Sequence, residues 1–177
     1  MTQEQKWIKA VLRRGSKDAA DQLVRSYYDA VYTFVYHQMS SPENAMDLTQ
    51  VIFIAALRSL PTYDAKKAGF RTWLYRIATN KVIDARRKVR PITVAIDEEE
   101  IAEGDFSDGV LNRELLGRIE EYVSLFDPHI QSIFRLRIYA DYSFPEIAET
   151  LSQPEAKIKA QYYRLMKRVR EEFDNHA

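Results

Sequence analysis

Residues 70–90 are the part of this sequence best equipped to bind another molecule. Apolar side chains recur there at the spacing of one helical face: Phe70, Trp73, Leu74, Ile77, Ala78, Val82, Ala85 and Val89. The opposite face is predicted to carry Arg71, Thr72, Arg76, Asn80, Arg87 and Arg90. Guanidinium groups suit phosphates and an amide suits a base edge, so this helix has the chemistry of a nucleic-acid surface. A solvated charged face would show the same charge pattern.

A second basic stretch lies between residues 157 and 170, where every charged side chain is basic. Ile158, Tyr162, Leu165 and Val169 recur at helical spacing and are predicted to be buried. Before them, Ser143 and Glu146 have the spacing of a capping box, and Ser152 and Glu155 repeat it. A short helix, a turn and a second helix form a helix-turn-helix, whose second helix reads duplex DNA.

The charges are distributed in blocks, although 26 basic and 26 acidic residues give a net charge of zero. Residues 64–90 include nine basic and two acidic side chains, and residues 97–121 include ten acidic and two basic ones. Two basic blocks therefore flank an acidic one. Because a polyanion responds to the local potential, a zero net charge does not exclude nucleic-acid binding.

Helices must position both basic stretches. Trp7 and Ile8 lie on one face of a predicted N-terminal helix, and Ser16 is predicted to cap the next helix. Ser41, followed by a proline, opens a third helix. Its middle, residues 51–57, is apolar on every side, which predicts burial in the fold or against a partner. Residues 60–69 are predicted to form a loop leading into the helix that begins at Phe70.

Several function classes are disfavoured. The chain has no cysteine, and its three histidines are scattered without metal-ligand spacing. No Ser-His-Asp set or phosphate-cradling glycine loop is present. No apolar run approaches the length needed to span a bilayer. We therefore expect no enzyme activity, no cofactor, no metal and no membrane insertion, and a cytoplasmic protein.

Two motifs in the first half resemble a known family. Asp47-Leu48-Thr49-Gln50, the nine residues from Phe70 to Ala78, and Asn80 resemble region 2 of the extracytoplasmic-function (ECF) group of bacterial RNA polymerase sigma factors. The resemblance implies that residues of the loop and following helix bind and melt the minus-ten promoter element: Tyr63, Arg71, Trp73, Arg76, Asn80, Lys81, Arg86 and Arg87. It also implies that residues of the third helix bind core polymerase: Asp47, Leu48, Gln50, Val51, Phe53 and Ile54.

The second half resembles sigma region 4, on the residues Phe144, Glu146, Ile147, Ala148, Leu151, Ile158 and Lys159. This resemblance implies contacts with the minus-thirty-five element through Lys157, Lys159, Ala160, Gln161, Tyr163, Arg164, Lys167 and Arg168. The chain departs from the family pattern in several places. Val51 stands where an acidic residue is usual, Ser152 and Ala156 replace glycines, and Gln161 replaces an arginine.

The resulting expectation is an all-α protein with a region 2 domain at residues 1–90, an acidic linker at residues 91–109 and a region 4 domain at residues 110–177. The implied partners are core RNA polymerase (its beta-prime clamp and beta flap), promoter DNA and an anti-sigma factor, with no obligate homo-oligomer. Two rivals stay open. One is a helix-turn-helix regulator that acts without being a polymerase subunit. The other is a helical scaffold whose basic faces bind an acidic protein.

Overall fold

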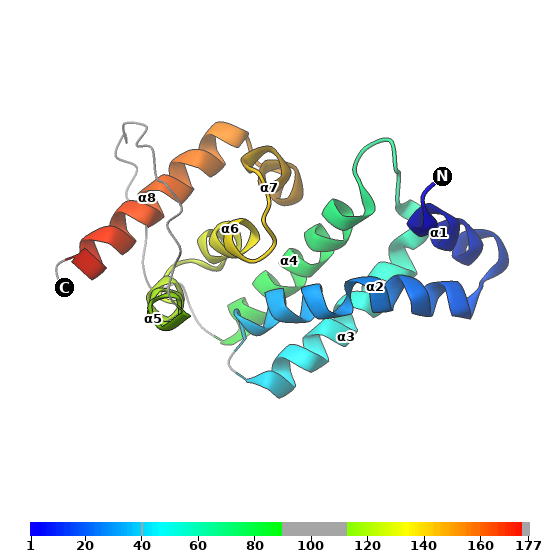
Figure 1. Ribbon diagram of the computed structural model, residues 1–177, viewed down its shortest axis with the longest axis horizontal. Helices are drawn as coiled ribbons and strands as arrows, with labels where there is room; N and C mark the ends of the chain where they lie inside the picture. The colour runs from blue at the N-terminus through cyan, green and yellow to red at the C-terminus, as the bar shows by residue number, and fades with distance from the viewer. Residues whose placement is uncertain (40, 90–112, 175–177) are drawn as a thin grey trace. The chain divides into compact units, whose positions relative to one another are not determined.

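The structure is a computed structural model that describes residues 1–39, 41–89 and 113–174 (Figure 1). Within these ranges the regular structure is helical, which confirms the predicted all-α class. The α-helices are α1 (Gln3–Arg14), α2 (Lys17–Tyr36), α3 (Pro42–Ser59), α4 (Phe70–Val89), α5 (Arg113–Val123), α6 (Pro128–Ile138), α7 (Phe144–Leu151) and α8 (Glu155–Asp174). A short 3-10 helix, η1 (Leu60–Thr62), follows α3.

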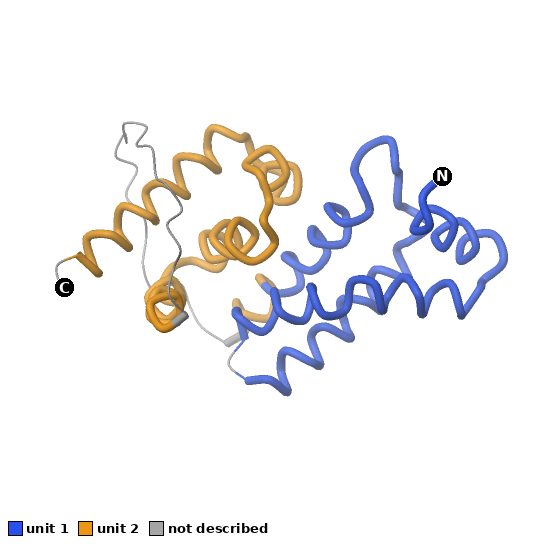
Figure 2. The backbone as a smooth tube through the Cα atoms, in the orientation of Figure 1, with its two compact units in different colours: residues 1–82 blue, residues 83–177 orange. Residues whose placement is uncertain are grey.

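The chain divides into two compact units, Met1–Val82 and Ile83–Ala177 (Figure 2). The division falls inside α4. The predicted linker at residues 91–109 lies outside the described residues, so the proposed domain boundaries stay a prediction.

Local hydrogen bonds begin and end the helices of the first unit. Ser16 caps α2, because its Oγ accepts a hydrogen bond from the backbone N–H of Ala19 at 3.2 Å. Ser41 caps α3 in the same way, accepting from Asn44 at 3.1 Å. Both caps confirm the sequence predictions. Gly15 ends α1 in the left-handed conformation, at φ 59°, where a side chain would cause strain.

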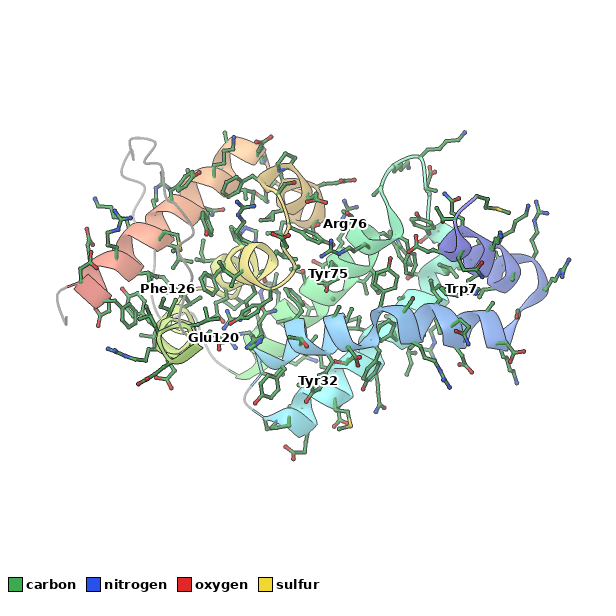
Figure 3. All side chains as sticks on the ribbon, viewed as in Figure 1. Trp7, Tyr32, Tyr75, Arg76, Glu120 and Phe126 are labelled. Carbon is green, nitrogen blue, oxygen red and sulfur yellow. The ribbon has the colours of Figure 1, made fainter. Side chains whose placement is uncertain are left out.

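In the first unit, α2 packs against α1 and α3. The core comprises fully buried apolar side chains from three helices: Val31, Val35, Ile52, Leu74, Ala78 and Val82. Aromatic contacts join α2 to α4, because the Tyr75 ring meets Phe34 edge-on, with 5.3 Å between centroids. Figure 3 labels Tyr75 among the side chains.

The buried face of α4 is rotated from the one predicted. Trp73 and Ile77, predicted to be in the apolar stripe, are half-buried. Thr72, predicted to face outward, is buried, as are Tyr75 and Thr79. The difference comes from tertiary packing, because Phe34 of α2 contacts Tyr75 of α4. Helix α4 therefore buries the side that carries Tyr75, and Trp73 lies at the edge of the core.

In the second unit, α7 and α8 form the predicted helix-turn-helix. Ser143 and Glu146 make the capping box, with the Ser143 N–H donating to Glu146 Oε2 at 2.8 Å. The second predicted box is wrong. Ser152 ends α7 in the left-handed conformation, at φ 54°, and α8 begins at Glu155. Ser152 serves as the C-terminal cap of α7. Because it lies three residues before the start of α8, it cannot also be the N-terminal cap of α8.

Helix α6 is buried on nearly every side. Asp127 caps it, accepting from the His129 N–H at 2.7 Å. The Gln131 side chain donates to the carbonyl oxygens of Ser124 and Phe126, at 3.1 and 2.8 Å, and accepts from Arg135 at 3.3 Å. Arg135 is only 1% exposed, and burial lowers its pKa to about 9, which leaves the guanidinium charged at neutral pH. Gln131 thus satisfies the carbonyls that follow α5.

Candidate nucleic-acid and polymerase interfaces

An aromatic cluster lies where the loop after α3 meets the first turn of α4. The Tyr63 ring lies 5.6 Å from Phe70 and 5.3 Å from Trp73, between centroids. Tyr27 of α2 meets Phe70 edge-on at 5.4 Å. Phe70 is buried, whereas Tyr63 and Trp73 are partly exposed. The cluster therefore joins the core to two aromatic faces that solvent can reach, and such faces can stack on an unpaired base.

Helix α1 supports this cluster through Glu4, whose carboxylate accepts a hydrogen bond from the Tyr27 hydroxyl. Burial raises the pKa of Tyr27, and the bond to Glu4 raises it further. Burial also raises the pKa of Tyr63, with the negative charge of Glu4 acting in the same direction. Both phenols are therefore neutral at physiological pH. Sequence reasoning missed Glu4, because no local spacing links it to a residue 23 positions away.

The outer face of α4 carries the predicted polar residues at different depths. Arg71, Asn80 and Arg87 are exposed, as predicted. The others are half-buried: Arg76, Lys81 and Arg86. The Arg71 guanidinium lies over the Tyr75 ring, 5.8 Å from its centroid, which holds this cation beside the helix surface.

On α3, residues with an exposed side chain recur at positions i, i+3, i+4 and i+7: Asp47, Gln50, Val51 and Ile54. Val51 is 46% exposed and Ile54 is 50% exposed, so two large apolar side chains face solvent in this stripe. Leu48 is half-buried. Phe53, predicted to contact polymerase, is only 6% exposed and stacks on Tyr28 at 5.9 Å. It is a core residue that holds α3 against α2.

Phe144, the first residue of α7, packs against the outer face of α8. The Phe144 ring lies 5.7 Å from the Tyr163 ring, and the Arg137 guanidinium lies 4.9 Å from its centroid. Arg137 Nη1 also donates to the Tyr142 carbonyl oxygen at 2.9 Å. These contacts fix the entry into α7 against α8. Sequence reasoning missed Arg137, whose partners lie on the following loop and helix.

The predicted duplex-contacting residues of α8 all retain some exposure. Lys157 and Lys167 are exposed, and the other members are half-buried: Lys159, Ala160, Gln161, Tyr163, Arg164 and Arg168. The predicted buried face of Ile158, Tyr162, Leu165 and Val169 is confirmed. Lys159 pairs with Glu155 at 2.9 Å, but both side chains are about two-fifths exposed, so the pair is weak.

Among the described residues, no group of histidine and acidic side chains is arranged to hold a metal ion. None of the described helices combines the length and the apolar character that crossing a bilayer requires. The described side chains provide stacking faces, cations, an amide and an apolar stripe, each of which can bind another molecule.

Comparison with known proteins assigns the chain to a family. Residues 23–91 match the model of the sigma-70 region 2 family. The ECF RNA polymerase sigma factor SigW of Bacillus subtilis is 31% identical over 171 residues, covering 90% of each chain. The chain therefore belongs to the ECF group of the sigma-70 family and is an RNA polymerase sigma factor.

Solved structures show the same fold. CnrH, solved in complex with the cytosolic domain of CnrY, matches with a TM-score of 0.71 at 20% identity, over 99% of this chain and 97% of that one. The sigma factor RpoE, solved with the anti-sigma factor NepR from Bartonella quintana, matches with a TM-score of 0.63 at 17% identity, over 85% and 94%.

Proposed function

We propose that the chain binds core RNA polymerase, directs it to particular promoters and holds the minus-ten element open. The observation that carries this mechanism is the position of the partly exposed rings of Tyr63 and Trp73 at the end of a helix that exposes Arg71 and Asn80. The cations bind phosphates, Asn80 reads a base edge, and the aromatic faces stack on an unpaired base. Binding energy alone then stabilises the open strand.

The polymerase contact uses the exposed stripe of α3. A groove on the beta-prime clamp would cover Val51 and Ile54, with Asp47 and Gln50 supplying polar contacts at the rim and Leu48 completing the patch. Phe53 acts indirectly, by supporting the helix from the core side. This contact would remove from water two large apolar side chains that are exposed in the free protein.

The second unit reads the minus-thirty-five element as duplex, with α8 in the major groove. Lys157, Lys167 and Arg168 contact phosphates, and Gln161 and Tyr163 face base edges. This unit also binds the beta flap. Residues 1–90 and 110–177 then act as region 2 and region 4, joined by the acidic residues 91–109.

The protein acts in the cytoplasm, without enzymatic activity of its own, and an anti-sigma factor holds it inactive. Solved relatives support this last point, because the sigma factor RpoE was captured with an anti-sigma factor. Such a partner would cover the same stripe on α3 that polymerase needs.

The test is transcription in vitro with core polymerase and a library of genomic fragments, followed by mapping of the start sites. We expect discrete start sites that require both the core enzyme and this chain. Sequence-specific DNA binding without polymerase, combined with no new start sites, would instead support the helix-turn-helix regulator.

A further inference from the structure

Phe70 is the centre of the aromatic cluster in the first unit. Its ring lies 5.6 Å from Tyr63 and 5.6 Å from Trp73, between centroids. These two rings are the ones proposed to stack on an unpaired base. The third contact of Phe70 is Tyr27 of α2, at 5.4 Å. Because both stacking rings contact Phe70, the side chain that holds Phe70 in place also influences the position of both.

Glu4 fixes the far end of Tyr27. The Tyr27 hydroxyl donates a hydrogen bond to the Glu4 carboxylate, and both side chains are half-buried. A hydrogen bond to a carboxylate is stronger than one between neutral groups. Tyr27 is therefore held at two points, by Phe70 at its ring and by Glu4 at its hydroxyl. Without this acceptor the half-buried hydroxyl would have to turn toward water, and the ring would turn with it.

Helix α1 is itself fixed at the end that carries Glu4. Thr2 and Gln5 form a capping box, with the Gln5 N–H donating to Thr2 Oγ1 at 3.2 Å. Glu4 lies in the first turn, where the macrodipole favours an acidic side chain. The helix packs against α2, which carries Tyr27, and against η1, which leads directly into Tyr63. Helix α1 therefore supports the cluster on two sides.

We infer that Glu4 is a positioning residue for base capture, which holds the two stacking rings in place through Tyr27 and Phe70. This inference rests on the proposed function. Because its negative charge repels phosphates, Glu4 acts through the rings and not through a contact with DNA. Stacking of one ring on a base contributes roughly 5- to 150-fold to binding, and a displaced ring loses part of that contribution.

The experiment compares holoenzymes assembled with the wild-type chain, Glu4→Ala, Glu4→Gln and the control Asp21→Ala. The control removes an acidic side chain from an exposed position of α2. Permanganate reactivity measures the fraction of promoter that is open. Glu4→Ala should lower the equilibrium constant for opening by about 5-fold, the lower end of the range for one stacked ring, because the rings are displaced but present. Glu4→Gln should recover part of this loss, since its amide oxygen accepts the same hydrogen bond. The control should match the wild type.

A second measurement separates positioning from a general effect on the fold. Promoters that lack one base at a time across the minus-ten element are opened by each holoenzyme. We expect one position at which removing the base weakens opening by the wild type and the control more than opening by Glu4→Ala. At that position the variant has already lost part of the contact that the missing base would make. A purely structural role would not produce this dependence on a single base.

Tyr27→Phe tests the same hydrogen bond with a smaller change, and it serves if Glu4→Ala does not fold. This variant keeps the ring against Phe70 and removes only the hydroxyl. It should give the same pattern as Glu4→Ala on intact and abasic promoters. A chain that carries both changes should lose no more than either single variant, because both changes remove one and the same hydrogen bond.

Three outcomes would overturn the inference. If Glu4→Ala and Tyr27→Phe open the intact promoter as well as the wild type does, the hydrogen bond does not position the rings. If Glu4→Ala shows the same loss relative to the wild type on every abasic promoter as on the intact one, Glu4 does not act through the captured base. Additive losses in the double variant would show that the two residues act separately. If no missing base weakens opening by the wild type, base capture fails and the proposed function with it, independently of Glu4.

Discussion

At the scale of single residues, the polar side chains of α4 range from exposed to fully buried. Asn80 and Arg71 are exposed and can meet DNA without any rearrangement. Thr72 and Thr79 have polar side chains on the same helix but are buried, so they serve packing. Polar character alone does not identify a binding residue, because the helix buries one side whatever the chemistry of that side.

Asn80→Ala should reduce promoter opening by about 1–3 kcal/mol, or roughly 5- to 150-fold, since a bidentate contact with a base edge contributes about this much. Folding should be unaffected, because an exposed substitution changes stability by no more than about 0.5 kcal/mol. The measurement is permanganate reactivity of the melted strand, with Asp84→Ala, an exposed change on the same helix, as the control. Unchanged reactivity for Asn80→Ala would remove this residue from the melting site.

We predict that His129 makes the stability of the second unit depend on pH. Burial lowers the pKa of His129, and Lys157 acts in the same direction, while Asp127 opposes the shift. The unfolded chain therefore takes up this proton at a higher pH than the folded chain. The contribution of neutral His129 to the free energy of unfolding is complete above pH 6.5, the ordinary pKa of histidine. This contribution is lost as the pH falls through and below that value.

Replacement by a neutral residue checks this prediction. His129→Gln cannot take up the proton, so its melting temperature should decline less than that of the wild type between pH 7 and pH 5. Thermal unfolding of the full chain, followed by circular dichroism, measures the difference. Parallel curves for the two proteins would show that His129 does not control the dependence.

At the scale of elements, α3 has two apolar faces with different tasks. Phe53 and Ile54 are adjacent in sequence, yet one is 6% exposed and the other 50% exposed. The helix repeat of 3.6 residues places them about 100° apart, and only one of these directions meets α2. An apolar run that looked uniform in sequence therefore contributes both a core face and a partner face.

Phe53→Ala and Ile54→Ala should have opposite consequences. Phe53→Ala should destabilise the chain by about 3–5 kcal/mol, because it removes a buried ring and leaves a cavity. Ile54→Ala should leave unfolding by urea nearly unchanged and weaken binding to core polymerase. Urea titration and a core-binding assay on both variants test this pair. Normal core affinity of Ile54→Ala would move the polymerase contact elsewhere.

At the scale of the whole molecule, the proposed function divides promoter recognition between the two units. In this proposal the first unit acts on the opened strand and the second on duplex DNA. A change in α8 should therefore alter affinity without altering the extent of opening once the promoter is saturated. A change at Asn80 should do the reverse.

Arg164→Ala should lower the salt slope of promoter binding by about one unit if this residue meets a phosphate. Permanganate reactivity at saturating holoenzyme should equal that of the wild type. The control is Arg170→Ala, another cation of α8 that lies outside the predicted contact set. A loss of opening at saturation would show that the units do not act separately.

The sequence alone determined the features that depend on short range. The caps at Ser16, Ser41 and Ser143 were predictable because each hydrogen bond joins residues three apart. The buried face of α8 was predictable because an amphipathic period persists over its length. The family was recognisable from nine consecutive residues for the same reason, since contiguous residues need no fold to be read together.

Only the tertiary structure decided which of several apolar directions each helix buries. Phe34 packs against Tyr75, so α4 buries the side that carries Tyr75. Tyr28 stacks on Phe53, which keeps the Phe53 ring in the core. Glu4 accepts a hydrogen bond from Tyr27. Each pair joins residues more than 20 positions apart. Such pairings depend on how helices pack, and a helix with apolar residues on two sides is compatible with either arrangement until its neighbours are in place.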